Sequence, residues 1–136
     1  MRDIKFRGWH KDRKEMCDVI DISFKRKKVT LPLETEEGEY YWYETENNLD
    51  DVELMQYTGC RDKNGVDIYE GDYLSLIIFE ANTEFKGEVV FSKGSFCVAI
   101  QIKGHDYKVP FHEMTEEDSL VEILGNIWEY GDLIDS

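Results

Sequence analysis

The stretch Tyr73-Leu-Ser-Leu-Ile-Ile-Phe79 decides the fold of this 136-residue chain, because it is apolar on both faces of an extended backbone. Leu74, Leu76 and Ile78 share one face, and the opposite face is also partly apolar. A strand of this kind is typical of the interior of a sheet, where it has a neighbouring strand on each side. The sequence therefore predicts a sheet with residues 73–79 as a central strand.

Segments with alternating apolar and polar residues continue on both sides of this stretch. Short strands at such spacing, joined by tight turns, are typical of a small SH3-like barrel of about five or six strands, which we expect over residues 52–136. A brief helical turn after Thr115 and a short helix over 127–134 account for the expected minor α content. The other strands of this part are expected at 54–57, 85–91, 96–103, 107–111 and 120–124.

The first 33 residues are predicted to form a separate N-terminal β element, with strands near 4–7, 16–24 and 29–33. This element is either a subdomain or a set of extra strands on the same core. Residues 34–51 are acidic and contain several aromatics, and we interpret them as a connector and as the boundary between domains. The predicted fold class is therefore mainly β, rich in strands with minor helix. The SH3-like barrel follows the N-terminal β element in this prediction.

Charge is distributed unevenly along the chain, which has 30 acidic and 16 basic residues and a formal net charge of −14. Residues 1–30 hold ten basic and five acidic side chains, so this segment is +5 and the remainder is −19. One interpretation is a pair of solvated faces that attract each other within or between chains. The other is recognition, in which an acidic surface occupies a basic site on another protein. Direct binding to DNA or RNA is disfavoured, because the isoelectric point is about 4.5.

Two clusters of residues are candidates for an interaction surface. The aromatic run Tyr40-Tyr-Trp-Tyr43 offers side chains that anchor interfaces, and a strand packed on a small core is the alternative. The basic run Lys25-Arg-Lys-Lys28 offers the clustered positive charge that contacts phosphate. The candidate interaction surface consists of Tyr40, Tyr41, Trp42, Tyr43, Lys25, Arg26, Lys27 and Lys28.

The motifs of catalytic and metal centres are absent from the sequence. Cys17, Cys60 and Cys97 are too scattered for a zinc site or a disulfide framework, and we interpret them as packing residues in a reducing compartment. His112-Glu-Met lacks the second histidine of a His-Glu-x-x-His motif, and no glycine-rich phosphate loop occurs. We therefore expect no metal, no cofactor and no enzymatic activity. The chain has no apolar run near the roughly 20 residues of a membrane helix and no signal peptide, so a cytoplasmic protein is expected.

Three blocks of sequence together form a pattern that is typical of one protein family. They are the opening Arg2-Asp-Ile-Lys-Phe-Arg-Gly-Trp9, the segment Leu54-Met-Gln-Tyr-Thr-Gly-Cys-Arg-Asp-Lys-Asn-Gly-Val-Asp-Ile-Tyr-Glu-Gly-Asp72, and the ending Glu122-Ile-Leu-Gly-Asn-Ile-Trp-Glu129. With these blocks the chain resembles the YopX family of phage and prophage proteins over nearly its whole length. It departs from the family pattern at Gly8, His10 and Cys60.

This resemblance implies a β-rich intracellular protein that is encoded by a phage or prophage and acts in the bacterial cytoplasm. It supplies no reaction, because the family has no established catalytic site. The residues of the central motif are interpreted as determinants of turns in the fold. These family-motif residues are Gly59, Asp62, Asn64, Gly65, Glu70, Gly71 and Asp72.

The sequence as a whole favours a non-enzymatic protein-binding or assembly module. Aromatic side chains and opposed blocks of charge suit a protein partner or self-association, so a homo-oligomer is expected. The alternative is an acidic DNA mimic that occupies a DNA-binding protein of the host or phage. A mimic of this kind requires carboxylates on one surface at intervals of about 7 Å, twice the axial spacing of phosphate charges along one strand.

Overall fold

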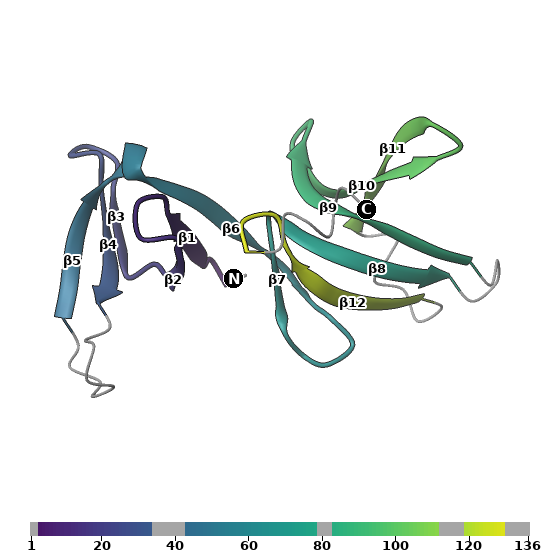
Figure 1. Ribbon diagram of the computed structural model, residues 1–136, viewed down its shortest axis with the longest axis horizontal. Helices are drawn as coiled ribbons and strands as arrows, with labels where there is room; N and C mark the ends of the chain where they lie inside the picture. Colours follow the sequence, from purple (N-terminus) through teal and green to yellow (C-terminus); the bar gives the residue numbers. More distant parts are fainter. Residues whose placement is uncertain (1–2, 34–42, 79–82, 112–118, 130–136) are drawn as a thin grey trace. The chain divides into compact units, whose positions relative to one another are not determined.

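The computed structural model describes residues 3–33, 43–78, 83–111 and 119–129. Antiparallel strands, numbered β1 to β12 in chain order, make up most of this part of the chain (Figure 1). The prediction of a mainly β fold is therefore confirmed.

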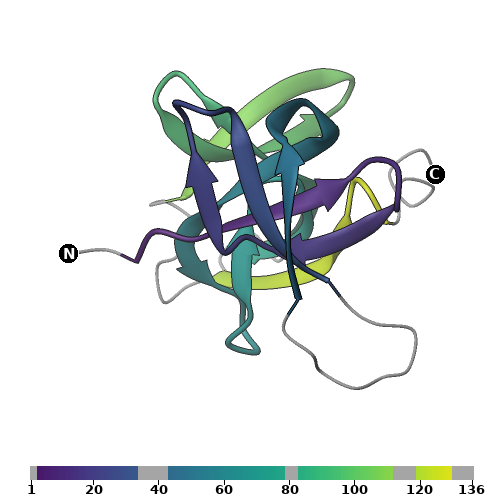
Figure 2. The same cartoon turned by 90° about the vertical axis from the view of Figure 1, so that its left-hand side faces the viewer.

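The chain divides into an N-terminal unit, Ile4–Gln56, and a C-terminal unit, Tyr57–Ser136, to which Met1–Asp3 also belong. In the N-terminal unit, β1 lies between β2 and the first half of β6, and β4 lies between β3 and β5 (Figure 2). The strands are β1 (Phe6–His10), β2 (Glu15–Asp18), β3 (Asp21–Ser23), β4 (Lys28–Leu33), β5 (Tyr43–Asn48) and β6 (Val52–Arg61).

The core of the N-terminal unit is small and centres on β4. Val29 and Leu31 are fully buried there, because alternate residues of a strand point to the same face, and they pack with Val52 of β6. His10 of β1 is also buried, and its Nε2 lies 3.2 Å from Oδ1 of Asn47 on β5. This contact fastens the two small sheets of the unit to each other.

The C-terminal unit contains a five-stranded antiparallel sheet in the order β11-β10-β9-β8-β12. As predicted, the stretch that begins at Tyr73 has a neighbour on each side, since β8 pairs with both β9 and β12. The second half of β6 pairs with the short strand β7 in the same unit. The strands are β7 (Asp67–Tyr69), β8 (Asp72–Ile78), β9 (Thr83–Ser92), β10 (Ser95–Ile102), β11 (His105–Pro110) and β12 (Ser119–Asn126).

One face of the five-stranded sheet forms the core of the C-terminal unit. Leu74 and Leu76 of β8 pack there with Val89 of β9 and Val98 of β10. The alternate positions of β9 and β10 point to the opposite face and are largely polar. The core side chains of the unit are Ile68, Leu74, Leu76, Val89, Val98, Ile100, Phe111 and Val121.

Two hairpin turns of this sheet are made by Lys-Gly pairs. Lys93 and Gly94 have φ angles of 51° and 82°, and Lys103 and Gly104 have 51° and 80°. Positive φ at both central residues defines a type I′ turn, which matches the twist of the strands on either side. Asn64-Gly65 is a turn of a different kind, because only Gly65 has a positive φ, of 79°.

The structure differs in detail from the predicted domain limits. The division between units lies at residue 56, whereas the sequence predicted a connector over 34–51. Within that connector, residues 43–48 form β5, and Leu49–Asp51 form a 3₁₀ turn. Residues 34–42 and the expected helical turn after Thr115 lie outside the described residues, as does most of the expected helix over 127–134. Among the described strands, β11 and β12 are the two edges of the sheet, and no pairing joins them into a closed barrel, so the SH3-like detail stays a prediction.

Candidate interaction site

The predicted aromatic surface lies mainly outside the described residues, which exclude Tyr40, Tyr41 and Trp42. Tyr43 begins β5, where its backbone pairs with Leu33 of β4. The expectation of an extended segment is therefore met at Tyr43, and the aromatic surface itself stays a prediction.

The predicted basic surface lies at the β3–β4 turn. Lys25, Arg26 and Lys27 form the turn, and Lys28 begins β4. Arg26 Nη2 lies 2.6 Å from Glu46 Oε1 on β5, and Lys28 Nζ donates to Asn48 Oδ1 at 2.5 Å. Because β4 pairs with β5, the basic run and the acidic stretch that follows it in sequence lie next to each other in the same unit.

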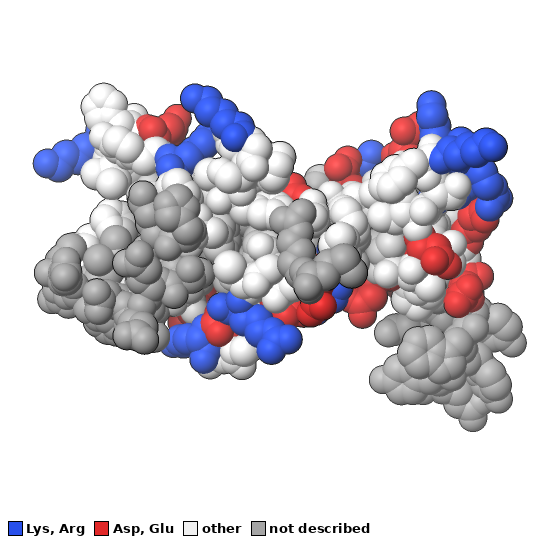
Figure 3. Space-filling view, turned by 180° about the vertical axis from the view of Figure 1, so that it is seen from behind, with Lys and Arg blue, Asp and Glu red and all other residues white. Residues whose placement is uncertain are grey.

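A second contact between the two charge blocks involves Lys11, after β1. Its ammonium group lies 3.1 Å from the carboxylate of Glu53 and donates to the backbone oxygen of Asp50 at 2.9 Å. On the face of this unit seen in Figure 3, basic and acidic side chains adjoin one another. These pairs confirm contact between the opposed charge blocks within the chain, which is one of the two arrangements that the charge distribution predicted.

The family-motif residues from Asp62 to Gly65 form the turn between β6 and β7. Asp62 is buried, and its Oδ1 accepts the backbone N–H groups of Asn64 at 2.9 Å and Val66 at 3.0 Å. Its Oδ2 accepts the N–H of Ile123 on β12 at 3.2 Å. Gly59 lies within β6, where the register with β7 shifts. One carboxylate thus fixes the turn and attaches it to an edge strand of the sheet.

The second group of family-motif residues forms the bend between β7 and β8. Asp72, which is 2% exposed, accepts the N–H of Tyr69 at 2.8 Å through Oδ2. The N–H of Gly71 donates to Val89 of β9, and the carbonyl of Gly71 accepts from Ile127 after β12, both at 2.9 Å. Glu70 lies in the same bend. These contacts connect the bend to β9 and to the end of β12, so both motif groups contribute to the fold.

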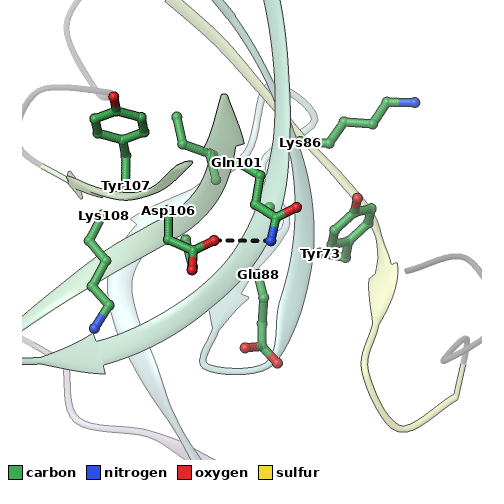
Figure 4. A pocket seen from close by; sticks show the side chains of 10 residues that line it. Tyr73, Lys86, Glu88, Gln101, Asp106, Tyr107 and Lys108 are labelled. Carbon is green, nitrogen blue, oxygen red and sulfur yellow. Dashed lines mark hydrogen bonds between the residues drawn. The ribbon is translucent and has the colours of Figure 1, made fainter. Parts of the chain in front are cut away.

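A groove of about 1020 Å³ lies on the polar face of the five-stranded sheet (Figure 4). The strands β8 to β11 supply its walls, and both signs of charge are present among its side chains. Figure 4 shows Lys86 and Lys108 on opposite sides of a central group that includes Gln101 and Asp106. The lining residues are Tyr73, Lys86, Gly87, Glu88, Ala99, Ile100, Gln101, Asp106, Tyr107 and Lys108.

Strand register places the groove residues in rows across the sheet. Glu88 is paired with Tyr73 on one side and with Ala99 on the other, and Ala99 is paired with Lys108. In the next row, Gln101 Nε2 donates to Asp106 Oδ1 at 3.0 Å. The first row thus brings together a tyrosine, a carboxylate and an ammonium group from three strands, with Ala99 of β10 between the last two.

Glu88 differs from an ordinary surface glutamate. Partial burial among its cross-strand neighbours raises the pKa of its carboxyl group, because desolvation disfavours the charged form. A carboxyl group with a perturbed pKa in a groove is a feature of functional sites as well as of structural ones. The Glu88 carboxyl group can donate a hydrogen bond to a polar ligand when it is protonated and can accept one when it is ionised.

Sequence reasoning did not identify this groove. The sequence did contain a signal for the groove. Polar residues such as Lys86, Glu88 and Gln101 occupy alternate positions of two strands that were predicted from their apolar face. Within the described ranges, no group of three His, Cys, Asp or Glu side chains is placed to hold a metal ion. The described part also contains no helix with the length and apolar character needed to cross a lipid bilayer.

Comparison with known proteins finds matches that cover nearly the whole chain. A model of the YopX protein family matches residues 5–135. The crystal structure of protein EF1440 from Enterococcus faecalis is similar, with a TM-score of 0.60, 21% identity, and coverage of 98% of this chain and 99% of that one. The structure of protein yopX from Bacillus subtilis gives a TM-score of 0.61 at 16% identity, covering 95% and 96%. No curated protein matches the chain. At these identities the similarity to the solved structures shows a common fold.

Proposed function

This chain belongs to the YopX protein family, and from that premise we propose that it is a non-enzymatic protein-binding or assembly module. Its proposed binding surface is the groove on β8 to β11. The observation that supports this proposal is the groove's lining, which combines Tyr73 with Lys86, Glu88, Asp106 and Lys108 on one open sheet face.

An open groove of this composition suits a polypeptide better than a small molecule. Small-molecule sites enclose most of the ligand surface and are mainly apolar, whereas this groove is polar and open to solvent. Tyrosine offers a rigid apolar ring with a polar end, and this combination makes it frequent at protein interfaces. Alternating charges add specificity, because a partner must present the opposite sign at each position.

The groove favours binding over catalysis. Its lining has no Ser, Cys or His that would serve as a nucleophile or as a histidine base. Of its two carboxylates, Asp106 is hydrogen-bonded to Gln101, and the protonated form of Glu88 is favoured by desolvation. A cytoplasmic, phage-related setting is part of the proposal, and it accords with the lack of a disulfide among the three cysteines.

A capture experiment with matched variants tests the groove. The wild-type chain, Lys86→Glu and Lys93→Glu are immobilised, and lysate of the cells that encode the chain is passed over each at moderate salt. The two variants change the charge equally, but Lys93 lies in the β9–β10 turn outside the groove. We expect a protein that is retained by the wild type and by Lys93→Glu and is lost from Lys86→Glu.

The result also separates the alternatives. Equal retention by all three columns, or no retained protein, would contradict the proposed groove. A retained DNA-binding protein that duplex DNA displaces, with Lys86→Glu unaffected, would instead indicate the acidic DNA mimic.

A further inference from the structure

We propose that the chain forms a homodimer in which β11 pairs antiparallel with β11 of a second copy. The inference rests on the proposed function as an assembly module and names the partner. It follows from the position of β11, from the direction of its backbone groups and from the order of its side chains.

The strand β11 is an exposed edge. Within the described part of the chain its strand neighbour is β10 alone, and residues His105 to Lys108 are all exposed. Tyr107, at 49% exposure, presents a large aromatic ring to solvent. An exposed edge strand offers backbone N–H and C=O groups to another strand, so natural proteins cover such edges or pair them.

The alternation of hydrogen-bonded and non-hydrogen-bonded pairs in the β10–β11 hairpin determines which backbone groups of β11 point away from β10. A two-residue type I′ turn is flanked by a hydrogen-bonded pair, here Ile102 and His105, and hydrogen-bonded and non-hydrogen-bonded pairs then alternate. Asp106 and Lys108 therefore direct their backbone groups away from β10. The backbone of Pro110, two residues further on, points in the same direction, and Pro110 has no N–H to donate.

One antiparallel register makes this edge complementary to itself. When Tyr107 lies opposite Tyr107 of the partner subunit, Asp106 lies opposite Lys108 of the partner subunit, and the reverse pair forms by symmetry. The outward backbone groups of Asp106 and Lys108 are then also in phase for hydrogen bonding. Opposite charges and aromatic rings facing each other both stabilise cross-strand pairs, and a twofold axis requires a self-complementary surface of this kind.

The neighbouring registers that would also bring the backbone groups of Asp106 and Lys108 to the partner strand are unfavourable. A shift in one direction sets Asp106 opposite its own copy, and a shift in the other direction sets Lys108 opposite its own copy. Like charges directly opposite each other destabilise a strand pair. The order of two charges along β11 therefore selects a single register.

The existing contacts of these two side chains leave room for the partner. Gln101 donates to Oδ1 of Asp106 at 3.0 Å, which leaves Oδ2 to face the partner's Lys108. Lys108 Nζ donates one hydrogen to Ser92 Oγ at 3.1 Å and has further hydrogens to donate. The pairs form on the groove face, so dimerisation extends the groove across the twofold axis.

Charge reversal in the full-length chain tests the register, with sedimentation equilibrium as the measurement. Asp106→Lys and Lys108→Asp each replace two attractive pairs by two repulsive ones, and we expect each to weaken the dimer about tenfold. An equimolar mixture of the two variants restores association, because every cross-strand pair is again of opposite charge. The double variant Asp106→Lys/Lys108→Asp restores it too, and it keeps the net charge of the wild type.

Lys93→Asp is the matched control, since it changes the charge by the same amount as Lys108→Asp at a turn outside β11. A chain that stays monomeric to about 1 mM, or single variants that weaken association no more than this control, would overturn the inference. So would a mixture that fails to associate. A monomer that still captures a protein through the groove leaves the proposed function standing, whereas a dimer with no groove-dependent capture contradicts the proposed function alone.

Discussion

The carboxylate of Asp62 accepts a hydrogen bond from the backbone N–H of Ile123, at 3.2 Å and across 61 residues of sequence. The same side chain holds the N–H groups of Asn64 and Val66 in its own turn. Asp62 is 8% exposed, so each of these donors would lack a strong acceptor without it. A motif that resembles a local turn signal in the sequence thus also connects the β6–β7 turn to an edge strand of the sheet.

Asp62→Asn is expected to release Ile123 selectively. An amide keeps one oxygen for the turn and sets an NH₂ group against the N–H of Ile123, so we expect a loss of about 2 kcal/mol in the free energy of unfolding. Asp62→Ala removes every acceptor and should cost about 3 kcal/mol or more. Hydrogen exchange of the Ile123 amide, with urea denaturation, measures both effects.

The adjacent exposed residue Lys63 serves as the control for this prediction. Its ion pair with Glu122, at 3.2 Å, lies at the surface, so Lys63→Ala should cost less than about 0.5 kcal/mol. Unchanged exchange at Ile123 in Asp62→Asn would contradict the assigned role.

Gly87→Ala is expected to disrupt the pairing of β9 with β10. A Cβ at this position would collide with the carbonyl oxygen of Ala99 and would lie 2.9 Å from Cγ1 of Val98. Backbone atoms cannot rotate away as a side chain can, so we expect a loss of about 3 kcal/mol. Gly94→Ala meets nothing within 4 Å and tests only the positive φ of 82°, at a cost of about 1 kcal/mol. Equal midpoints for the two variants in thermal unfolding would contradict the close approach.

The ion pair between Arg26 and Glu46 is expected to contribute little stability. Both side chains are largely exposed, at 62% and 44%, so water screens their attraction. A double-mutant cycle with Arg26→Ala and Glu46→Ala should give a coupling of about 0.2 to 1 kcal/mol that falls as salt increases. A coupling well above this range would mean that the charge blocks hold the unit together.

Glu88→Gln is expected to stabilise the chain near neutral pH. Desolvation raises the pKa of Glu88 above its ordinary value of 4.5, so ionisation is less favourable in the folded state than in the unfolded state. The resulting penalty is absent below the ordinary pKa and grows as pH rises through the folded pKa. We expect a gain below about 0.5 kcal/mol at pH 7, because the side chain is only half-buried, and none below pH 4.

Thermal unfolding of the wild type and Glu88→Gln across this pH range measures the difference, with Glu44→Gln on exposed β5 as the control. A constant difference from pH 4 to pH 7 would contradict the role of ionisation.

The strands were predictable where one face is buried, because alternation along the chain records burial directly. Leu74 and Leu76 were predicted to share one face of a central strand, and the structure places both in the core of the C-terminal unit. The type I′ turn at Lys103-Gly104 was missed, since lysine gives no signal for a positive φ. The turn at Asn64-Gly65 was found, but its anchoring to Ile123 was not, because nothing near Asp62 in sequence specifies a partner 61 residues away.

By itself, the sequence determined the mainly β class, the central position of β8 and the YopX family, since these depend on residue patterns along one segment or on motif matches. Only the tertiary structure decided that the basic run beside Arg26 meets the acidic stretch at Glu46, and that β8 to β11 form a groove. The physical reason is that both features depend on strand register and on the direction of side chains in neighbouring strands. A strand's own alternation shows which residues share a face, whereas its partners are chosen by the packing of the whole unit.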